Sequence, residues 1–384
     1  MEITDVSAYP VRVPLRSRDE GGIAPYVTNH NSVKAMDRVL VRVDTDEGIH
    51  GWGEVRTFLS PSATVSVIEE GVAPLVTGWS PFELERIQRA VFMEYANPSL
   101  FFAPVETACW DVVGKALDRP VYELLGGWTA PSTEGRRRDA STVDASAVSA
   151  AYCLGILSPE ESAEHARKVR DEGYSVLKTK AGRDWRQDVE RIVAMHEAVD
   201  GDLEFRLDPN QGWRLDEAVR VAATLEDEGI YLQYMEQPIR VDDHGSLGHL
   251  RKRTRQPIAA NEDTYIPNNP MQLARNEAVD VAVVDFTPLG GISGLRATAA
   301  TLEAGNIPLA HHCAMDLGVR TAAIVHAVRG IPGFDLPMDT TYYAWEDNII
   351  ETPLDIEDGR IVTPDGHGFG VEVDPDALAK YAIE

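Results

Sequence analysis

From about residue 148 onward, short apolar segments alternate with amphipathic segments of helical period, and this repeat constrains the fold more than any other feature. No glycine-rich dinucleotide fingerprint follows the first apolar segment, which argues against an open doubly wound sheet. Strands that alternate with helices in this way predict an α/β fold, a (β/α) barrel with a parallel sheet. The eight expected strands lie at 150–154, 175–179, 203–207, 231–235, 258–260, 281–284, 308–310 and 334–338.

The residues before this repeat have a different pattern, which predicts a separate α+β domain over residues 1–128. Three β-rich stretches predict a small antiparallel sheet, and they lie at 3–13, 38–43 and 49–55. Three helices should follow, at roughly 62–76, 81–96 and 105–117. Pro81 and Pro104 are expected near the first turns of the last two helices, where proline is well tolerated.

The barrel domain is expected over residues 129–348. Its first stretch, 129–146, is polar and includes Arg136, Arg137 and Arg138, so it predicts a linker or surface loop. The remaining residues, 349–384, should pack back on the first domain.

The formal net charge of −26 comes from 62 acidic residues against 36 basic ones, spread along the whole chain. Such an acidic protein repels phosphate backbones, which makes nucleic acid a poor partner. Only seven of the basic residues are lysines. We interpret the acidic, lysine-poor composition as halophilic adaptation, because the Debye length falls to about 3 Å at molar salt and screens self-repulsion. The close pair Lys178 and Lys180 is therefore unusual.

No apolar run reaches the roughly 18 residues of a membrane span, and the first residues lack the basic and apolar segments of a signal peptide. We therefore expect a cytoplasmic protein without membrane contact. The three cysteines, Cys109, Cys153 and Cys313, are widely spaced and form no Cys-x-x-Cys pair. Neither a disulfide framework nor a zinc-thiolate site is indicated.

Residues with acid-base or ligand chemistry follow successive expected strands at intervals of 28, 28, 26, 23 and 27 residues, about one βα unit each. Any one of them has an ordinary explanation, such as a helix N-cap or a core histidine. Six in register at the carboxyl ends of barrel strands predict one active site at the barrel mouth. They are Lys180, Asp208, Glu236, Glu262, Asp285 and His312.

Three of these residues, Asp208, Glu236 and Glu262, would bring carboxylates close together. Like charges at close range raise each other's pKa values, so a divalent cation is needed to keep all three ionised. Oxygen ligands alone suit Mg²⁺ or Mn²⁺, whereas zinc would be expected to recruit histidine or cysteine. The pattern predicts a site for Mg²⁺, with Mn²⁺ as the alternative.

Lys178 and Lys180 are spaced so that both side chains point to the same face of a strand, into the barrel. A lysine pKa near 10.4 must fall by about 3 units for work as a base at neutral pH, and burial, a like charge and a metal ion can lower it. Across the mouth, Asp285 is placed to hold His312 in one tautomer and raise its basicity. His311 should turn outward if His312 faces the barrel interior.

Several motifs of this chain resemble those of the mandelate racemase subgroup of the enolase superfamily. They are 178–182, 208–213, 236–238, Asn261 with Glu262, Asp285 with Gly290 and Gly291, and 308–312. Residues 106–127 resemble the family's capping domain, so the resemblance covers nearly the whole chain. It implies a modified TIM barrel of the (β/α)7β form with an N-terminal α+β capping domain, and Mg²⁺-dependent removal of the proton alpha to a carboxylate.

The resemblance also implies roles for individual residues. Lys180 and His312 would abstract or return protons on opposite faces of the substrate, and Asp285 would pair with His312. Lys178 would contact the substrate carboxylate. Asp316 would take the place of the acid that hydrogen-bonds the developing enediolate.

The motifs do not assign the third metal ligand to a single residue. Sugar-acid dehydratases similar to glucarate dehydratase place an asparagine there, which makes Asn261 a rival to Glu262. Asp263 is a further alternative.

The enediolate expected in this subgroup has two fates: reprotonation in a racemase or epimerase, and loss of a β-hydroxyl in a dehydratase. We favour dehydration of a sugar acid to a 2-keto-3-deoxy acid, because 339–340 and 345–348 resemble glucarate-type dehydratases. The polar stretch 16–32 should close over the mouth and suits a polyhydroxylated ligand. Candidate substrate contacts are Tyr26, Thr28, His30, Asn31, Asn210 and Asp339.

Two alternatives stay open at this point. One is a racemase or epimerase of a 2-hydroxy or amino acid on the same site. The other is a non-catalytic sugar-acid binding protein, which is disfavoured because a matched set of acid-base residues serves no purpose in binding alone. In each case the partner is a small carboxylic acid, and we expect the chain to form a homo-oligomer.

Overall fold

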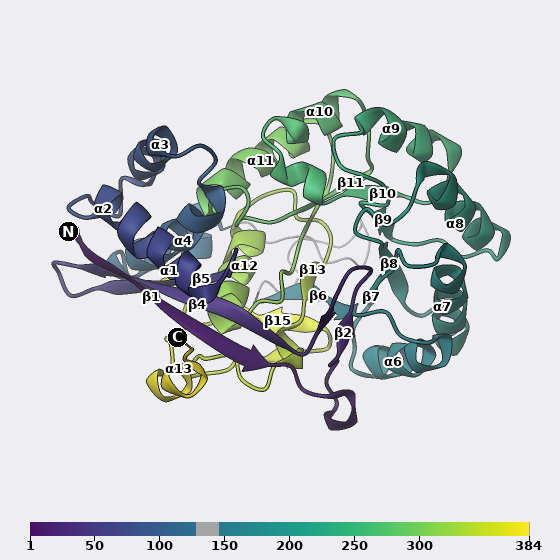
Figure 1. The fold of residues 1–384 in the computed structure, drawn as a ribbon, viewed down its shortest axis with the longest axis horizontal. Helices are drawn as coiled ribbons and strands as arrows, with labels where there is room; N and C mark the ends of the chain where they lie inside the picture. Colours follow the sequence, from purple (N-terminus) through teal and green to yellow (C-terminus); the bar gives the residue numbers. More distant parts are fainter. Residues whose placement is uncertain (128–145, 384) are drawn as a thin grey trace.

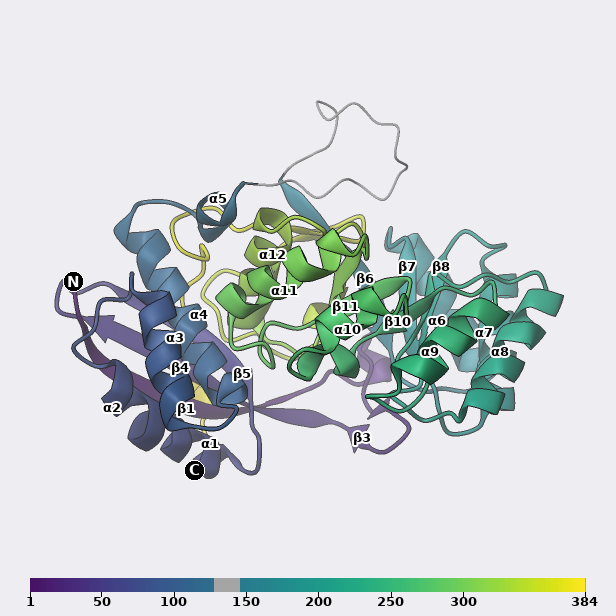
Figure 2. The ribbon, with the colours of Figure 1, turned by 90° about the horizontal axis from the view of Figure 1, so that it is seen from above.

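The computed structural model describes residues 1–127 and 146–383, and it shows a barrel with a smaller α+β domain beside it (Figures 1 and 2). The barrel strands pair in parallel in chain order from β6 to β12, and β13 pairs with β6. They are β6 (Ala147–Leu154), β7 (Val176–Lys180), β8 (Glu204–Asp208), β9 (Tyr234–Glu236), β10 (Ile258–Ala260), β11 (Val281–Val284), β12 (Leu309–His311) and β13 (Met338–Thr340). The predicted fold, a modified TIM barrel with an N-terminal capping domain, is confirmed.

In the described part of the chain, a helix follows each of the first seven barrel strands and lies on the outside of the barrel (Figure 1). These helices are α6 (Pro159–Asp171), α7 (Trp185–Ala198), α8 (Leu215–Asp227), α9 (His244–Arg253), α10 (Asn269–Arg275), α11 (Ile292–Ala304) and α12 (Gly318–Gly330). Local sequence sets several helix starts: Ser158 and Glu161 form a capping box on α6, and Asp184 and Asp243 cap α7 and α9.

Two barrel strands lie closer to the C terminus than the sequence predicts. Strands are expected at 231–235 and 334–338, whereas β9 and β13 begin three and four residues later. The apolar residues ahead of each strand lie outside the sheet. Tyr231 is half exposed, and Phe334 packs beside His311. Apolar content locates a strand but does not define its first residue.

The capping domain has a three-stranded antiparallel sheet in the order β1-β4-β5, with helices packed beside it (Figure 2). Its strands are β1 (Ile3–Pro14), β4 (Ala35–Thr45) and β5 (His50–Arg56). Its helices are α1 (Pro61–Ser66), the π-helical turn η2 (Val67–Val72), α2 (Ala73–Val76), α3 (Leu84–Glu94), α4 (Ser99–Ala116) and α5 (Val121–Leu125).

The two prolines expected near helix starts lie elsewhere, so that prediction was wrong. Pro81 comes three residues before α3, and Pro104 lies inside α4, which begins at Ser99. The apolar residues 100–103 extend the helix by about a turn ahead of Pro104, which removes only one backbone donor. A Cβ atom on Gly53 would lie only 2.0 Å from the carbonyl oxygen of Pro104. The close contact between α4 and β5 therefore requires glycine at position 53.

Two buried carboxylates of the capping domain complete the N-terminal ends of barrel helices. Glu106 of α4 accepts hydrogen bonds from the first two backbone N–H groups of α11, at 2.8 and 2.9 Å. Glu54 of β5 accepts from the backbone N–H groups of Leu317 and Arg320 at the start of α12, both at 2.9 Å. The first N–H groups of a helix have no partner within it, so these carboxylates satisfy them and complement the helix dipole.

The segment between β1 and β4 leaves the capping sheet and reaches the barrel (Figure 1). It contains a 3₁₀ turn, η1 (Arg18–Glu20), and the short strands β2 (Tyr26–Val27) and β3 (Ser32–Val33). Val27 accepts a backbone hydrogen bond from Ile156 at 2.7 Å, and the Asn29 side chain donates to the carbonyl of Pro209 at 2.8 Å. These contacts hold the segment against the ends of β6 and β8.

The residues after the barrel contact both parts of the molecule. In the strand pair β14 (Ile356–Glu357) and β15 (Arg360–Val362), β15 pairs antiparallel with β6. Gly368 accepts a backbone hydrogen bond from Val121 of the capping domain, and Ile383, beyond α13 (Pro375–Tyr381), donates to Pro10 of β1. The expected surface loop at 129–146 lies, except for its last residue, outside the described residues.

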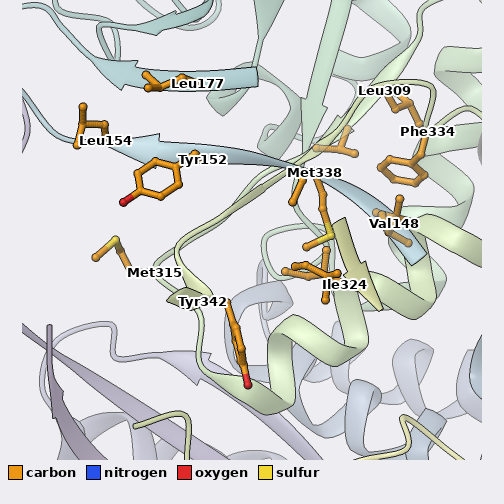
Figure 3. Close-up of a cluster of buried hydrophobic side chains, with 14 of the residues drawn as sticks. Val148, Tyr152, Leu154, Leu177, Leu309, Met315, Ile324, Phe334, Met338 and Tyr342 are labelled. Carbon is orange, nitrogen blue, oxygen red and sulfur yellow. The ribbon is translucent and has the colours of Figure 1, made fainter. Parts of the chain in front are cut away.

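A large buried cluster joins β6, β13 and α12, and Figure 3 shows part of it. Tyr152, Ile324 and Met338 come from these three elements, and the ring of Tyr152 stacks on Tyr343 with centroids 3.9 Å apart. In the described part of the chain, no helix is long and apolar enough to cross a membrane. Cys109, Cys153 and Cys313 are free thiols.

Candidate active site

The six residues predicted at strand ends lie at the carboxyl ends of the barrel strands. Lys180, Asp208 and Glu236 end β7, β8 and β9, Glu262 begins the 3₁₀ helix η4 (Glu262–Tyr265) after β10, and Asp285 and His312 directly follow β11 and β12. A cavity of ≈160 Å³ opens at this mouth, and Lys180 and His312 both line it.

Lys178 and Lys180 extend from the same face of β7 into a group of carboxylates. The Nζ of Lys178 lies 2.7 Å from Glu236 Oε1, 2.7 Å from Asp339 Oδ2 and 3.3 Å from Asp208 Oδ2. The Nζ of Lys180 donates to Asp208 Oδ2 at 2.5 Å and to the Asn210 side-chain oxygen at 2.9 Å. Two ammonium groups therefore share three buried carboxylates.

The charges in this cluster shift its pKa values in different directions. Burial acts against the charge on Lys178, but the carboxylates of Asp339, Glu236 and Asp208 outweigh it and hold the pKa of Lys178 well above its usual range. Burial also opposes the charge on Asp208, yet Lys180 and Lys178 hold the pKa of Asp208 below its usual range. Burial and the neighbouring Asp208 raise the pKa of Glu236 to about 8. The cluster lacks enough positive charge to keep every carboxylate ionised at neutral pH.

On the opposite side of the mouth, an arginine holds the aspartate that contacts His312. His312 Nδ1 lies 3.3 Å from Asp285 Oδ2, while Asp285 Oδ1 accepts from Arg320 at 2.5 Å and from the backbone N–H of Thr287 at 2.8 Å. Burial opposes the charge of Asp285, but Arg320 and His312 hold its pKa well below the usual range. The carboxylate therefore stays ionised and can hold the imidazole in one orientation.

His311 turns away from the cavity, as its place in the strand predicts. Its Nδ1 lies 2.7 Å from the carbonyl oxygen of His312, and its ring packs between Phe286 and Phe334. Burial lowers the pKa of His311 to about 4, so the ring is neutral at physiological pH.

The three candidates for the third metal position differ in their contacts. Asp263 accepts hydrogen bonds from the Gln237 side chain at 2.8 Å and from the backbone N–H of Asp242 at 2.7 Å. The Asn261 amide donates to Tyr265 at 2.7 Å and to a backbone carbonyl of β11. Glu262 has weaker contacts through Oε1, and its buried Oε2 has no partner. Both carboxylate oxygens of Asp263 are therefore occupied, whereas Glu262 keeps an unpartnered oxygen and the contacts of Asn261 use its NH2 group rather than its oxygen.

Two family models match the chain. Residues 14–126 match the N-terminal domain of mandelate racemase and muconate lactonizing enzyme, and residues 161–377 match the enolase C-terminal domain-like family. The chain belongs to the mandelate racemase/muconate lactonizing enzyme family of the enolase superfamily. The resemblance inferred from the sequence motifs is thereby confirmed.

Relatives within this family catalyse different reactions. An N-succinyl-L-Arg/Lys racemase of Bacillus cereus is 30% identical over 76% of this chain and 74% of its own. A cis-3-hydroxy-L-proline dehydratase of Roseibium aggregatum is 28% identical over 100% of both chains. An arabinonate dehydratase of Saccharolobus solfataricus is 25% identical over 90% of this chain and 91% of its own. The relatives are thus enzymes, both dehydratases and racemases, that act on small carboxylic acids.

Solved structures agree over nearly the whole chain. An isomerase from Streptomyces coelicolor A3(2) has a TM-score of 0.80 at 31% identity and covers 99% of this chain and 98% of its own. A dipeptide epimerase from Enterococcus faecalis V583, solved with Mg and L-Leu-L-Tyr, has a TM-score of 0.86 at 23% identity over 97% of this chain and 100% of its own, and shares the fold. Enzymes of this superfamily use Mg²⁺.

The chemistry of the donor set in this family member fits such a cation. Asp208, Glu236 and Glu262 offer oxygen ligands only, and buried oxygens of Glu236 and Glu262 have no hydrogen-bond partner. Within the described residues no three acidic, histidine or cysteine side chains are already arranged around a metal-sized point. The ammonium groups of Lys178 and Lys180 instead lie among the carboxylates. A divalent cation would supply the positive charge that this cluster lacks.

The contacts of Asp316 differ from the role that the resemblance implied. Its carboxylate pairs with Arg38 at 3.0 Å and with Arg320, and it does not line the cavity. Two arginines hold it in the interface between capping domain and barrel, so it is not placed to donate to a substrate. Asp339, expected to contact substrate, is likewise buried, between Lys178 and Arg206 at 2.7 Å from each.

The other expected substrate contacts do line the cavity, and they are Tyr26, Thr28, His30, Asn31 and Asn210. Four further lining residues were not predicted from the sequence, namely Arg56, Cys153, Cys313 and Thr341. Arg56 follows Glu54 by two residues in a β-rich stretch, and that spacing could have placed both side chains on one face of the sheet. No sequence signal distinguished the other three.

Proposed function

We propose that the protein removes the proton alpha to the carboxylate of a sugar acid and expels the β-hydroxyl group, giving a 2-keto-3-deoxy acid. The observation that carries this proposal is that Lys180 and His312 line one cavity from different strand ends, β7 and β12. Acid-base groups on separate walls of a cavity can serve different faces of one carbon atom.

In this proposal the α-proton moves to one of the two residues, and the electron pair moves into the carboxylate to form an enediolate. The other residue donates a proton to the β-hydroxyl, which leaves as water, and the resulting enol takes up a proton at carbon 3 to give the keto acid. Asp285 keeps His312 oriented for this transfer. Asp208, Glu236 and Glu262 would hold Mg²⁺, which when bound stabilises negative charge on the carboxylate oxygens.

The lining of the cavity supports a polyhydroxylated substrate. Thr28, Asn31, Asn210 and Thr341 contribute hydroxyl and amide groups to it, and Tyr26 adds a phenol. Groups of this kind can hydrogen-bond sugar hydroxyls in addition to their present partners, since Thr28 donates to Asn31 and Asn210 accepts from Lys180. The arabinonate dehydratase among the relatives supports the same substrate class.

Racemisation or epimerisation of a 2-hydroxy or amino acid is the second candidate. One specific observation favours it: Lys180 and His312 line the same cavity from different strand ends, and two such acid-base residues are sufficient for inversion without any leaving group. The racemase among the relatives supports this alternative.

One experiment separates the two. The protein is incubated with Mg²⁺ and a panel of sugar acids in D₂O, and the products are analysed for 2-keto-3-deoxy acids and for deuterium at the α-carbon. Dehydration predicts keto acid, whereas epimerisation predicts washed-in deuterium with inverted configuration. Lys252→Met, in an exposed lysine of α9, is the matched control for Lys180→Met. Full turnover without divalent metal would contradict both candidates.

A further inference from the structure

One face of the capping sheet presents three charged residues toward the loop that follows His312. Arg38 of β4 lies opposite Arg56 of β5 in the strand register, and Glu54 precedes Arg56 by two residues. Arg38 pairs with Glu54 at 2.8 Å and also donates to the carbonyl oxygen of Ala314 at 3.0 Å. Its charge is therefore compensated and buried in the interface between the domains.

Arg56 differs from its neighbour. Within the residues that the structure describes, its guanidinium makes no ion pair or hydrogen bond, and it lines the same cavity as His312 and Met315. The side chain of Arg56 is exposed at the mouth. Its pKa is lowered by the surrounding protein and by the nearby charge of Arg38, and the charges of Asp285 and Asp316 offset part of this effect. An arginine that lines a cavity without a direct ion pair can form one with an arriving anion.

In the part of the chain that the structure describes, no carboxylate pairs directly with Arg56, although Asp285 and Asp316 act on it from farther away. Its other strong cations, Lys178 and Lys180, are already paired with carboxylates. Among the described residues that line the cavity, none is an aspartate or a glutamate, although the chain carries 62 acidic residues. Arg56 comes from the capping domain and lies on the histidine side of the cavity, whereas the proposed carboxylate and metal site lies on the lysine side.

We infer that Arg56 binds a second anionic group of the substrate, carried at the end opposite the carboxylate whose α-proton is removed. This inference rests on the proposed function and deepens it, because it assigns the substrate to acids with an anionic group at both ends. A carboxylate and a phosphate share the geometry that a guanidinium binds in two-point fashion. Arg56 is thus a specificity-determining residue for the distal end of the substrate.

The test is a calorimetric comparison of ligands that differ only at the distal end. Gluconate ends in a hydroxymethyl group, glucarate in a carboxylate and 6-phosphogluconate in a phosphate, and galactonate with galactarate repeats the comparison in another configuration. Lys180→Met serves as the background in the presence of Mg²⁺, so that turnover adds no heat. Ionic strength is matched throughout, because salt screens such contacts.

Ligands with a distal anion should bind at least about tenfold more tightly than their neutral partners. The better of glucarate and 6-phosphogluconate identifies the anion as carboxylate or phosphate. Arg56→Gln should remove this advantage and leave gluconate and galactonate binding unchanged, and Arg56→Lys should keep part of it. Arg255→Gln, in an exposed arginine just before β10 at the far end of the barrel, should change neither.

The inference is overturned if the distal anion gives no advantage, if no ligand of either series binds, or if Arg56→Gln weakens neutral and anionic ligands alike. The proposed function fails by a different result. If the protein prefers distal anions through Arg56 but forms no keto acid, only the proposed reaction is contradicted. If it dehydrates sugar acids without this preference, only the inference about Arg56 is contradicted.

Discussion

The two sides of the barrel mouth differ in the charged residues that surround their acid-base groups. On the lysine side, Lys178 and Lys180 lie among carboxylates that all come from barrel strands, and Asp339 also pairs with Arg206. On the histidine side, Asp285 is held by Arg320, which also pairs with Asp316. That pairing continues through Arg38 and Glu54 into the capping domain.

The difference shows which side can change its charge. On the lysine side the pKa of Glu236 is raised to about 8, and buried oxygens of Glu236 and Glu262 have no partner, so the ionisation of this side depends on whether a divalent cation is bound. On the histidine side, arginines pair with Asp285 and Asp316 and keep their pKa values low, so both stay ionised without any added ion. We therefore expect variants on the lysine side to change the metal dependence of the reaction. Variants on the histidine side should change activity and leave the metal dependence as it is.

The sharpest test of this comparison removes one acid-base residue from each side. Lys180→Met and His312→Asn should each lower kcat/KM by about 10⁴-fold, because each removes a proton transfer that the reaction needs. In D₂O, one of the two variants should still exchange the substrate α-proton, since the remaining residue can act alone. Lys252→Met should behave as wild type. Full activity in both variants would mean that the chemistry lies elsewhere.

A second test concerns the third metal position. Glu262→Gln should weaken Mg²⁺ or Mn²⁺ binding by about 100-fold, because it removes a charged oxygen ligand. Asp263→Asn should leave metal affinity unchanged and instead lower the free energy of unfolding by about 2 kcal/mol, since the carboxylate of Asp263 accepts buried hydrogen bonds. Metal titration by calorimetry and urea denaturation measure the two quantities. The reverse outcome would assign the ligand to Asp263.

On the histidine side, Arg320→Lys keeps the charge but loses the forked geometry that reaches Asp285, Asp316 and Thr287 together. We expect kcat/KM to fall about tenfold with metal affinity unchanged, because Asp285 then holds His312 less firmly. Arg329→Lys, on the same helix but outside this network, is the matched control. A change in metal affinity in Arg320→Lys would contradict the separation of the two sides.

A histidine outside the mouth gives the smallest effect. His326 Nδ1 accepts from the backbone N–H of Tyr122 at 3.2 Å, and Nε2 donates to the carbonyl of Phe369 at 3.2 Å, so the ring must be neutral. Burial lowers its pKa from 6.5 to about 3. Its contribution to stability is therefore present above pH 6.5 and is lost as the pH falls toward 3, because the unfolded chain takes up the proton first.

Between pH 7.5 and 5.5 this residue alone should lower the free energy of unfolding by about 1 kcal/mol. His326→Gln can accept and donate the same hydrogen bonds without titrating, so its acid-induced loss should be smaller by that amount. Urea denaturation at the two pH values checks this. His249→Gln, in an exposed histidine of α9, should match the wild type, and an unchanged pH dependence in His326→Gln would refute the assignment.

The barrel and most of its mouth could be predicted from the sequence because their signals are local. Each barrel strand is a short apolar run followed by a polar residue, so Lys180, Asp208 and His312 could be placed from spacing alone. The role of Asp316 could not, because it depends on Arg38, a partner 278 residues away in another domain. Arg56 was missed for the same reason: only the packing of the capping sheet against the barrel brings it to the cavity.

The glutamates that bind the N-terminal ends of α11 and α12 affect how chimeras of such proteins should be designed. Glu106 and Glu54 belong to the capping domain, yet they satisfy the first N–H groups of two barrel helices. A barrel transplanted onto a foreign capping domain would lose both carboxylates and expose unsatisfied helix ends at the new junction. Chimeras between relatives should therefore be designed with Glu54 and Glu106 inherited together with the helices they serve, as one exchangeable block rather than as separate modules.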